Sequence, residues 1–369
     1  MTSEDFPIHL KEETYKKLEK EKEKMGFGSK SWNEWLNSVF SDRSEQKSLS
    51  EIIEEALRKN TYELFYDDWI RNFALNLENI WKEDSARNLM PQTTEPRKLS
   101  SALVIGRGPS LIKHDHLNLL ANSDYRGTII CTDGILENVL NAGITPNKFK
   151  NFFVVTIDSQ ERISNYYDNS ITKQYGSGIK SILSTTLSTK TYNAVKKAGI
   201  KVYWIHTLFD YDKGKSSFNY ISGVMSRSKF HKKGLPAIQT GGNIGTAAWI
   251  IAWSVLKCSH VGLIGIDHGY YPETSWEEIA KFHPHSKVSS DVDKNSNAFK
   301  KAFPTIYNPD FNCYCIQDPS FQCYANALKE FIPKASKWVK TINATEGGSI
   351  FGVGIECMTL KNFLSTYNF

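Results

Sequence analysis

The chain has 369 residues, of which 40% are hydrophobic and 23% are charged, and its formal net charge is +5 at pH 7. This composition is ordinary for a globular protein with one large α/β domain and appendages, or with two domains. The modest charge permits an anionic ligand but lacks the strong, clustered basic signal of most nucleic-acid-binding proteins. The N-terminus does not look like a signal peptide, and the most apolar window, 247–256, is shorter than the roughly 20 residues of a membrane span. We therefore expect a cytoplasmic protein without a membrane partner.

The six cysteines are expected to be reduced thiols in that compartment. Cys313, Cys315 and Cys323 lie close together in the sequence, downstream of His283 and His285. A zinc site is conceivable there, but the spacing matches no standard zinc-binding pattern, so we do not favour it.

Residues 1–45 contain the pattern strand, helix, glycine turn, helix. Apolar residues alternate with others over 6–11, which predicts a short, half-buried strand. A helix with an acidic start at Glu12 follows and ends at a glycine turn. Ser31 and Glu34 then form a capping box, which predicts the start of a second helix.

This pattern resembles a ribbon-helix-helix module. Such modules pair their strands in two-fold dimers, and in DNA-binding members the outward side chains of the ribbon enter the major groove. Here those side chains are Pro7, His9 and Lys11, of which only Lys11 is positively charged. We therefore favour a module for homodimerisation or packing, and DNA binding is the less favoured alternative.

Residues 46–98 are predicted to form a helical region that ends in a linker. Ser48 and Glu51 form another capping box, and aromatic residues over 62–73 continue a helical period. The polar run 91–96 begins and ends with proline, so it is the best linker candidate. The predicted division of the chain is 1–45, 46–98 and 99–369.

Residues 99–369 alternate short apolar strands with helices. This alternation predicts an α/β fold with a Rossmann-like, mostly parallel sheet covered by helices on both faces, preceded by the helical N-terminal region. The expected strands are Ala102–Ile105, Thr128–Cys131, Phe152–Ile157, Ser181–Leu183, Val202–Ile205, Val261–Ile264 and Val339–Ile342. Ligands of such sheets bind beyond the carboxyl ends of the strands, so the residues after each strand are the site candidates. The aromatic-rich segment 270–335 is expected to be an insertion over the site, where ordinary packing is slightly favoured over contact with a substrate.

A glycine-rich turn follows the first expected strand. It consists of Gly106, Arg107, Gly108, Pro109 and Ser110. Glycines let a backbone approach a phosphate closely, and N–H groups and the Ser110 hydroxyl at a helix start can donate to it. The turn lacks the third glycine of the dinucleotide fingerprint and the Gly-Lys of a P-loop, so a tight turn without a ligand is the alternative.

Polar residues also follow the second, third and last expected strands. Thr132 and Asp133 come after the second strand, where an Asp can bind a ribose hydroxyl or cap the next helix. Asp158 comes after the third strand, where it can ligate Mg²⁺ that is bound to phosphates, or serve as a cap. Glu346 and Gly347 follow the last strand and are further candidates for nucleotide binding.

Two more polar clusters belong to the same pattern. Gly241, Gly242 and Asn243 precede a long helix, and such a start can hold a phosphate or a carboxylate. Asp267 and His268 follow a later strand and are candidates for acid–base catalysis, although a histidine without that role is nearly as common. Many strands of this one sheet end in polar or glycine-rich residues. This favours a shared ligand site over the alternative that each motif is only a turn or a helix cap.

These strand-end motifs, in this order, resemble those of the MptE-like family over about residues 99–360. The motifs that carry the resemblance are Gly106–Leu111, Thr132–Gly134 with Gly143–Pro146, Asp158, Gly241–Asn243, Gly265–Asp267 and Asn343–Gly348. The family is named after the archaeal 6-hydroxymethyl-dihydropterin diphosphokinase and also includes motility-accessory, flagellin-modifying glycosyltransferases. The Gly-x-Gly-Pro-Ser-Leu turn also looks like that of bacterial sialyltransferases, which use CMP-activated sugars.

The resemblance implies a nucleotide-dependent transferase. The diphosphokinase transfers a diphosphoryl group from ATP, and it has an Asp-Leu-Asp motif where this chain has Thr156 and Asp158 around an isoleucine. The missing carboxylate matters because phosphoryl transfer relies on metal ions to neutralise charge. We therefore favour a glycosyltransferase that uses a nucleotide-activated sugar, with the diphosphokinase as the alternative.

In the favoured interpretation, the phosphates bind at Gly106–Ser110 and the base or ribose lies near Asp133 and Asp158. Asp267 or His268 then assists the attack of an acceptor hydroxyl. A second alternative is a non-catalytic nucleotide sensor that reports to DNA through its N-terminal module.

Overall fold

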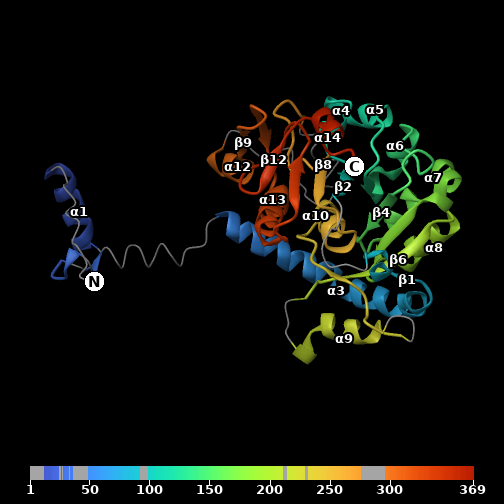
Figure 1. Ribbon diagram of the computed structural model, residues 1–369. Coiled ribbons are helices and arrows are strands. Elements are labelled where there is room, and N and C mark those ends of the chain that lie inside the picture. Colours follow the sequence, from blue (N-terminus) through green and yellow to red (C-terminus); the bar gives the residue numbers. More distant parts are fainter. Residues whose placement is uncertain are drawn as a thin grey trace. The chain divides into compact units, whose positions relative to one another are not determined.

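The structure is a computed structural model. It describes residues 12–24, 26, 28–32, 34–35, 49–91, 99–210, 214–228, 232–275 and 296–369. The chain divides into two compact units, Met1–Ile52 and Ile53–Phe369, and the second contains the sheet (Figure 1). No helix in these described ranges is long and apolar enough to cross a membrane.

The first unit contains the helix expected after the N-terminal strand, α1, Glu12–Lys24. Ser31 and Glu34 form the expected capping box: the N–H of Glu34 donates to Ser31 Oγ at 3.1 Å, and the N–H of Ser31 donates to Glu34 Oε2 at 2.8 Å. The strand expected over 6–11 and the cap expected at Ser48 lie outside the described residues. The ribbon-helix-helix interpretation and its homodimer therefore stay predictions.

The helical region expected before the sheet contains one long helix, α3, Leu49–Lys82. Two asparagines on α3, Asn72 and Asn76, are buried. Asn72 Nδ2 donates to the carbonyl oxygens of Ser159 and Thr186 at 3.2 Å and 3.0 Å. Because both carbonyl groups lie shortly after strands of the sheet, these hydrogen bonds hold α3 along the carboxyl edge.

A ten-stranded sheet forms the centre of the second unit. Its order is β1-β6-β5-β4-β3-β2-β8-β11-β12, with β7 paired to β6, and every pair is parallel. The strands are β1 (Asp84–Ser85), β2 (Ser101–Ile105), β3 (Thr128–Thr132), β4 (Phe152–Thr156), β5 (Lys180–Ser184), β6 (Lys201–Thr207), β7 (Ala237–Ile238), β8 (His260–Ile264), β11 (Lys340–Asn343) and β12 (Ile355–Cys357). The expected strands are confirmed as β2 to β6, β8 and β11. The short strands β1, β7 and β12 were not predicted, because two or three residues show no periodicity.

Side chains along the strands alternate between two hydrophobic cores, one on each face of the sheet. On β2, Leu103 and Ile105 belong to one core, while Ala102 and Val104 belong to the other. Helices α5, α6, α8 and α14 contribute to the first core, and α10 and α13 to the second. This confirms the Rossmann-like α/β fold with helices on both faces. The helices around the sheet are α4 (Ser110–Lys113), α5 (His116–Ala121), α6 (Leu136–Asn141), α7 (Ser170–Tyr175), α8 (Thr189–Lys197), α9 (Phe218–Met225), α10 (Ile244–Ile250), α12 (Asn297–Ala302), α13 (Pro319–Phe331) and α14 (Leu360–Thr366).

The direction in which strands are added reverses beside β2. The chain places β3, β4, β5 and β6 on one side of β2, and β8, β11 and β12 on the other. Ligands of open parallel sheets bind beyond the carboxyl ends of the strands, so the site is expected at this edge. In the aromatic-rich segment, β9 (Thr305–Asn308) and β10 (Cys313–Ile316) form a separate antiparallel pair.

Candidate functional site

A cleft of about 950 Å³ lies at the carboxyl edge of the sheet. Its wall contains residues that follow β2, β3, β4, β5 and β6, the start of α10, and residues of α3 and α13. The predicted site residues in this wall are Arg107, Thr132, Asp133, Asp158, Gly241, Gly242 and Asn243. The fold therefore brings together predicted residues from loops that are far apart in the sequence.

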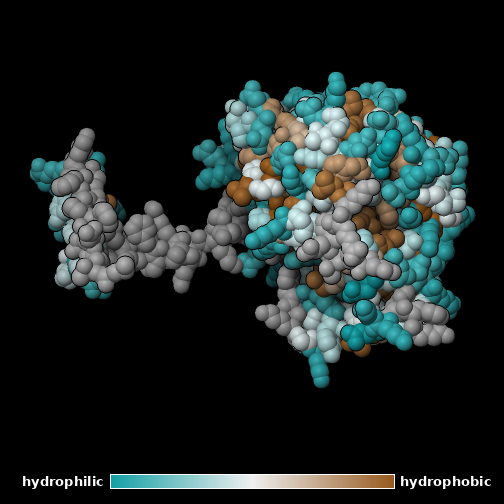
Figure 2. Space-filling model, in the orientation of Figure 1, coloured by the Kyte–Doolittle hydropathy of each residue, from teal (hydrophilic) through white to brown (hydrophobic). Residues whose placement is uncertain are grey.

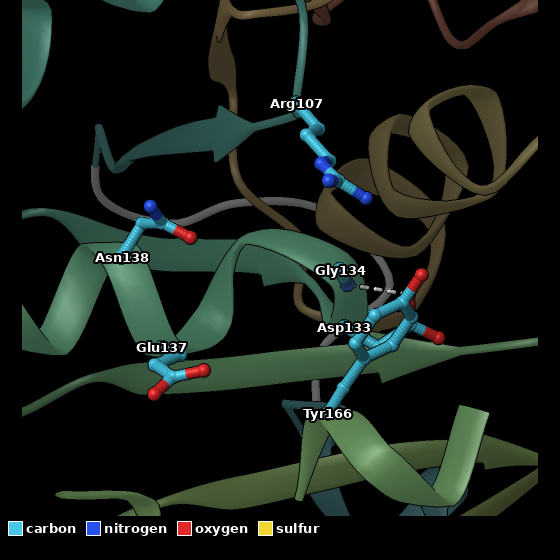
Figure 3. Close-up of a pocket in the computed structure, with 6 residues that line it drawn as sticks. All are labelled: Arg107, Asp133, Gly134, Glu137, Asn138 and Tyr166. Carbon is cyan, nitrogen blue, oxygen red and sulfur yellow. Dashed lines mark hydrogen bonds between the residues drawn. The ribbon is translucent and has the colours of Figure 1, made fainter. Parts of the chain in front are cut away.

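A recess of about 150 Å³ adjoins this cleft. Its lining consists of Arg107, Asp133, Gly134, Glu137, Asn138 and Tyr166 (Figure 3). The close-up shows Arg107 extending toward Gly134, while the ring of Tyr166 lies beside Asp133. A guanidinium, an amide, a phenol and two carboxylates thus surround a small space. This mixture of donors and acceptors suits a group with several hydroxyls.

Asp133 is the most perturbed carboxyl group of the cleft wall. The side chain is almost fully buried, and its Oδ1 accepts a hydrogen bond from the N–H of Gly134 at 2.7 Å. Its Oδ2 is buried and has no hydrogen-bond partner within the described structure. Burial raises the pKa of Asp133 from 3.8 to about 7, and the negative charge of Asp158 adds to the rise. A buried carboxyl oxygen without a partner is costly, which points to a ligand that supplies one.

Asp158 lies at the end of the next strand, β4, and its side chain is 34% exposed. Its Oδ1 accepts a hydrogen bond from the N–H of Gln160 at 3.0 Å, and its Oδ2 lies 3.7 Å from Nη2 of Arg162. Mg²⁺ in nucleotide sites is commonly held by one or two carboxylates together with substrate phosphates. The partly exposed Asp158 can supply one such carboxylate.

The described residues contain no group of three or more His, Cys, Asp or Glu side chains that could hold a metal ion. Cys313, Cys315 and Cys323 form no disulfide with another described residue, while His283 and His285 lie outside the described residues. A metal at this cleft would therefore depend on oxygens from the substrate as well as on the protein.

Thr156 occupies the place where the Asp-Leu-Asp motif of the diphosphokinase has its first carboxylate. Its side chain is fully buried, and its Oγ1 lies 2.5 Å from the phenol oxygen of Tyr167, within hydrogen-bond distance. The nearby hydroxyl also lowers the pKa of Asp133, which opposes the larger effect of burial. Thr156 thus acts on Asp133 from its buried position, and its uncharged hydroxyl contributes no negative charge to a metal site.

The glycines of the turn after β2 are required by its contact with the loop after β8. The N–H of Gly108 donates to the carbonyl of Gly265 at 2.7 Å. A Cβ atom at Gly106 would lie 2.3 Å from the Gly265 carbonyl oxygen, and one at Gly108 would lie 1.9 Å from Oδ2 of Asp267. Arg107 is the member of this turn that lines the cleft. Both positions therefore require glycine because the loops after β2 and β8 pack closely against each other.

Asp267 is held by the start of α4 and lies outside the cleft wall. The hydroxyl of the fully buried Ser110 donates to Asp267 Oδ2 at 2.9 Å, while Asp267 Oδ1 is buried without a hydrogen-bond partner in the described structure. Burial raises the pKa of Asp267 to about 7. Ser110 and Pro109, predicted to bind a nucleotide, also lie outside the wall. In this structure the Ser110 hydroxyl therefore binds a carboxylate of the protein itself.

His268 is buried against α13, with its ring centroid 6.1 Å from those of both Phe321 and Tyr324. Burial lowers the pKa of His268 to about 3, so its imidazole is neutral near pH 7. The cleft wall does not include His268. The catalytic roles of Asp267 and His268 thus stay predictions.

Glu346 and Gly347 build the loop after β11 and lie outside the cleft wall. Glu346 Oε1 accepts a hydrogen bond from the N–H of Leu360 at 3.1 Å, at the start of α14, and lies 3.3 Å from His116 Nε2. The carbonyl of Gly347 accepts a hydrogen bond from Thr345 Oγ1 at 2.7 Å. These contacts stabilise the loop, and nucleotide binding by its residues stays a prediction.

The start of α10 opens on the cleft. Gly241 and Gly242 have φ values of +59° and +84°, which residues with a Cβ atom rarely adopt. A Cβ atom at Gly242 would also lie 2.9 Å from the ring of Tyr324. Asn243 caps the helix, because its side chain accepts a hydrogen bond from the N–H of Thr246 at 3.0 Å. The glycines let the chain pass close to α13 while the helix start remains in the wall.

Part of the cleft is an aromatic wall, and the sequence did not assign its α3 residues to a site. On α3 it includes Tyr62, Phe65 and Trp69, and α13 contributes Tyr324. The ring centroid of Trp69 lies 5.3 Å from that of Phe209, which follows β6 and also lines the cleft. The helical spacing of the α3 aromatics is visible in the sequence. Periodicity indicates that one face of a helix makes contacts, but it does not show whether the partner is the protein core or a ligand.

The fold and the cleft define a Rossmann-like α/β protein with a polar and aromatic cleft at the carboxyl edge of a parallel sheet. The family model described as 6-hydroxymethylpterin diphosphokinase MptE-like matches residues 71–273. The chain belongs to the MptE-like family, which confirms the resemblance seen in the strand-end motifs.

Among solved structures, the MAf glycosyltransferase from Magnetospirillum magneticum AMB-1 is similar to this chain, with a TM-score of 0.47 and 15% sequence identity. The likeness covers 76% of this chain and 38% of that chain, so this chain spans less than half the length of that structure. A search of curated proteins finds no significant match.

Proposed function

We propose that this protein is a glycosyltransferase that binds a nucleotide-activated sugar in the cleft. The observation that carries the proposal is the buried, unpartnered oxygen of Asp133, a residue that lines both the cleft and the recess. Membership of the MptE-like family supports a nucleotide-dependent transferase. The location of the cleft beyond the carboxyl ends of the parallel strands supports a nucleotide ligand.

The two spaces of the site differ in size and chemistry, and this difference suggests how a donor is placed. The cleft of about 950 Å³ has the aromatic wall, which offers flat apolar surfaces for a nucleobase. The recess of about 150 Å³ is small and polar, and it suits one sugar ring whose hydroxyls bond Glu137 and Asn138. Arg107 and Asp158 lie in the wall of the cleft, where Arg107 can bind phosphate directly. Asp158 would hold Mg²⁺, which neutralises the charge of the phosphates when bound.

In this arrangement the bond between the anomeric carbon and the phosphate oxygen breaks, and the nucleotide leaves with the electron pair. The oxygen of an acceptor hydroxyl forms the new bond to the anomeric carbon, and its proton passes to a base. We propose Asp133 as that base, because it lies in the cleft wall and its pKa of about 7 suits proton transfer near neutral pH. Asp267 and His268 are poorer candidates, since neither belongs to the wall.

The second candidate function is a diphosphokinase that transfers a diphosphoryl group from ATP to a pterin alcohol. The name of the family model favours it. The chemistry of Thr156 opposes it, because that position carries a buried hydroxyl bonded to Tyr167 where the resembled motif has a carboxylate. A phosphoryl-transfer site with one metal-binding carboxylate fewer neutralises less charge in the transition state.

The two functions release different nucleotides, so product analysis separates them. The full chain is incubated with UDP-, CMP- and GDP-activated sugars, with and without Mg²⁺, and in parallel with ATP and a 6-hydroxymethylpterin. Glycosyl transfer or slow donor hydrolysis releases UDP, CMP or GDP. Diphosphoryl transfer instead releases AMP, and AMP without release from any sugar donor would overturn the proposal.

Variants then link the reaction to the cleft. Asp133→Asn should abolish nucleotide release while binding persists, and Arg107→Ala should weaken binding about tenfold or more, as expected when a charged hydrogen bond to phosphate is lost. Asp124→Asn is the matched control, because Asp124 is an exposed carboxylate outside the wall. Full activity of Asp133→Asn would remove Asp133 from the role of base.

A further inference from the structure

Helix α9 presents an apolar surface to solvent. Tyr220, Ile221, Val224 and Met225 are 49%, 39%, 44% and 40% exposed, respectively. Together they form what we call the α9 surface. In Figure 1 the helix lies beyond α3, away from the sheet. Its first residue, Phe218, packs against Phe73 of the core, with ring centroids 5.5 Å apart, while the four residues named above stay exposed. Four partly exposed large apolar side chains on one two-turn helix are more than scattered surface residues require.

The opposite side of α9 is firmly held by the second unit. Ser222 is fully buried, and its hydroxyl lies 3.0 Å from Nε2 of His206. Asp210 fixes the start of the helix, since it accepts hydrogen bonds from the Ser217 hydroxyl at 2.8 Å and from the N–H of Asn219 at 3.0 Å. These hydrogen bonds, together with the packing of Phe218 on Phe73, set the orientation of the helix, and they leave the four residues of the α9 surface facing outward.

An aromatic residue of α3 extends the α9 surface. Trp81 is 40% exposed, and its Nε1 donates to the carbonyl of Met225 at 2.9 Å. Trp and Tyr are the residues that favour the boundary between water and lipid, because their rings are apolar and their N–H or O–H groups are polar. Trp81 and Tyr220 thus flank the aliphatic residues with side chains suited to such a boundary.

The surroundings of α9 are basic. Lys215, Arg227, Lys232 and Lys233 are exposed, and the sequence from 213 to 233 contains no Asp or Glu. Among the described residues, two acidic groups on neighbouring elements, Asp210 and Glu78, already have partners. The carboxylate of Asp210 accepts the hydrogen bonds at the helix start, and that of Glu78 on α3 forms an ion pair with Lys82.

We propose that the α9 surface docks the protein on an anionic phospholipid membrane. Exposed aliphatic residues flanked by Lys and Arg are the features of a helix that lies in the membrane interface, with its apolar side chains among the acyl chains and its cations at the phosphates. Nucleic acid fits less well, because Ile221, Val224 and Met225 can neither stack on bases nor bond to phosphate. The sequence-based expectation of no membrane partner rested on the lack of a spanning segment, which does not bear on a peripheral contact.

Vesicle flotation of the full chain tests this proposal. The probe is vesicles of phosphatidylcholine with or without phosphatidylglycerol, and the protein should float only with the anionic vesicles and should be released by salt. Ile221→Ser with Val224→Ser removes apolar contact, and Lys232→Glu with Lys233→Glu reverses charge. Each double variant should lower the bound fraction about tenfold or more, given about 1 kcal/mol for each basic residue near an anionic surface.

The controls use side chains of the same kinds elsewhere. Ile112→Ser alters an apolar residue that is 90% exposed, and Lys300→Glu with Lys301→Glu reverses exposed charge on α12; both should float as the unchanged protein does. The proposal would be overturned by no flotation of the unchanged protein, by equal loss in the controls, or by unaltered flotation of both α9 variants. Sedimentation showing that the α9 variants disrupt a dimer, with no flotation, would assign the surface to a second copy and likewise overturn it.

Discussion

Replacement of Asp133 by Asn should make the protein less sensitive to alkaline pH while it destroys activity. The carboxyl group of Asp133 is buried with one oxygen unpartnered, and its pKa rises from 3.8 to about 7. The folded state therefore holds this proton more tightly than the unfolded chain does. Stability from this group is fully present below pH 3.8 and is lost as the pH rises through about 7. Asn cannot ionise, so the variant is free of this loss.

The magnitude follows from the shift in pKa. One pKa unit corresponds to about 1.4 kcal/mol, and integration between pH 5 and pH 8 gives a change of about 2.6 kcal/mol in the free energy of unfolding. At pH 5 the variant should be less stable, because the buried amide N–H₂ of Asn replaces an oxygen that has no partner, at a cost of about 1–3 kcal/mol. At pH 8 the parent has lost the stability that came from the protonated Asp133, and the variant has not. The unfolding free energy of the variant should therefore equal or exceed that of the parent.

Urea denaturation at pH 5, 6, 7 and 8 measures the difference in unfolding free energy between Asp133→Asn and the parent. The difference should move in favour of the variant by about 2.6 kcal/mol across the series. Asp124→Asn controls for the loss of one carboxylate at an exposed position. A difference that stays constant with pH would refute the reasoning, because it would mean that the Asp133 carboxyl group ionises as easily in the folded protein as in the unfolded chain.

Three further substitutions test contacts around the cleft. Gly108→Ala should lower stability by about 1–3 kcal/mol, because its Cβ atom would lie 1.9 Å from Asp267 Oδ2; an unchanged melting temperature would show that the two loops are not tightly packed. Asn76→Ala should cost about 1–3 kcal/mol, because its Nδ2 donates to the carbonyl of Leu187 at 2.7 Å; denaturation that matches the parent would contradict this role. Burial lowers the pKa of His206 from 6.5 to about 4, so its stabilising effect is present above pH 6.5 and is lost as the pH falls through about 4. Between pH 7 and pH 4, the His206→Gln variant should therefore lose about 3 kcal/mol less unfolding free energy than the parent. An acid denaturation curve as steep as that of the parent would count against this expectation.

The strands of the central sheet were predictable because they are buried on both faces. Phe152–Thr156 and His260–Ile264 read as short apolar runs, and runs of that kind between helices indicate a parallel sheet. The addition of β1, Asp84–Ser85, at one edge was not predictable, because a strand of two residues gains its hydrogen bonds from a neighbour that is distant in sequence.

The site was predictable only in part, because proximity to a strand end does not determine where a side chain points. Arg107, Asp133 and Asp158 were selected for following strands, and they do line the cleft. Asp267 was selected by the same rule, yet Ser110 holds it under the glycine turn. The rule identifies the correct edge of the sheet, and the contacts of each loop decide which residues face the open space.

The sequence by itself determined the alternation of strands and helices, the turns that require glycine, and the family to which the chain belongs, because these are carried by local spacing and residue type. Only the tertiary structure decided what the cleft contains. It placed Tyr62 and Trp69 of α3 across from loops of the sheet, and it buried one oxygen of Asp133 without a partner. Burial and desolvation depend on atoms that are brought together from all parts of the chain, so the raised pKa of Asp133 becomes visible only after folding.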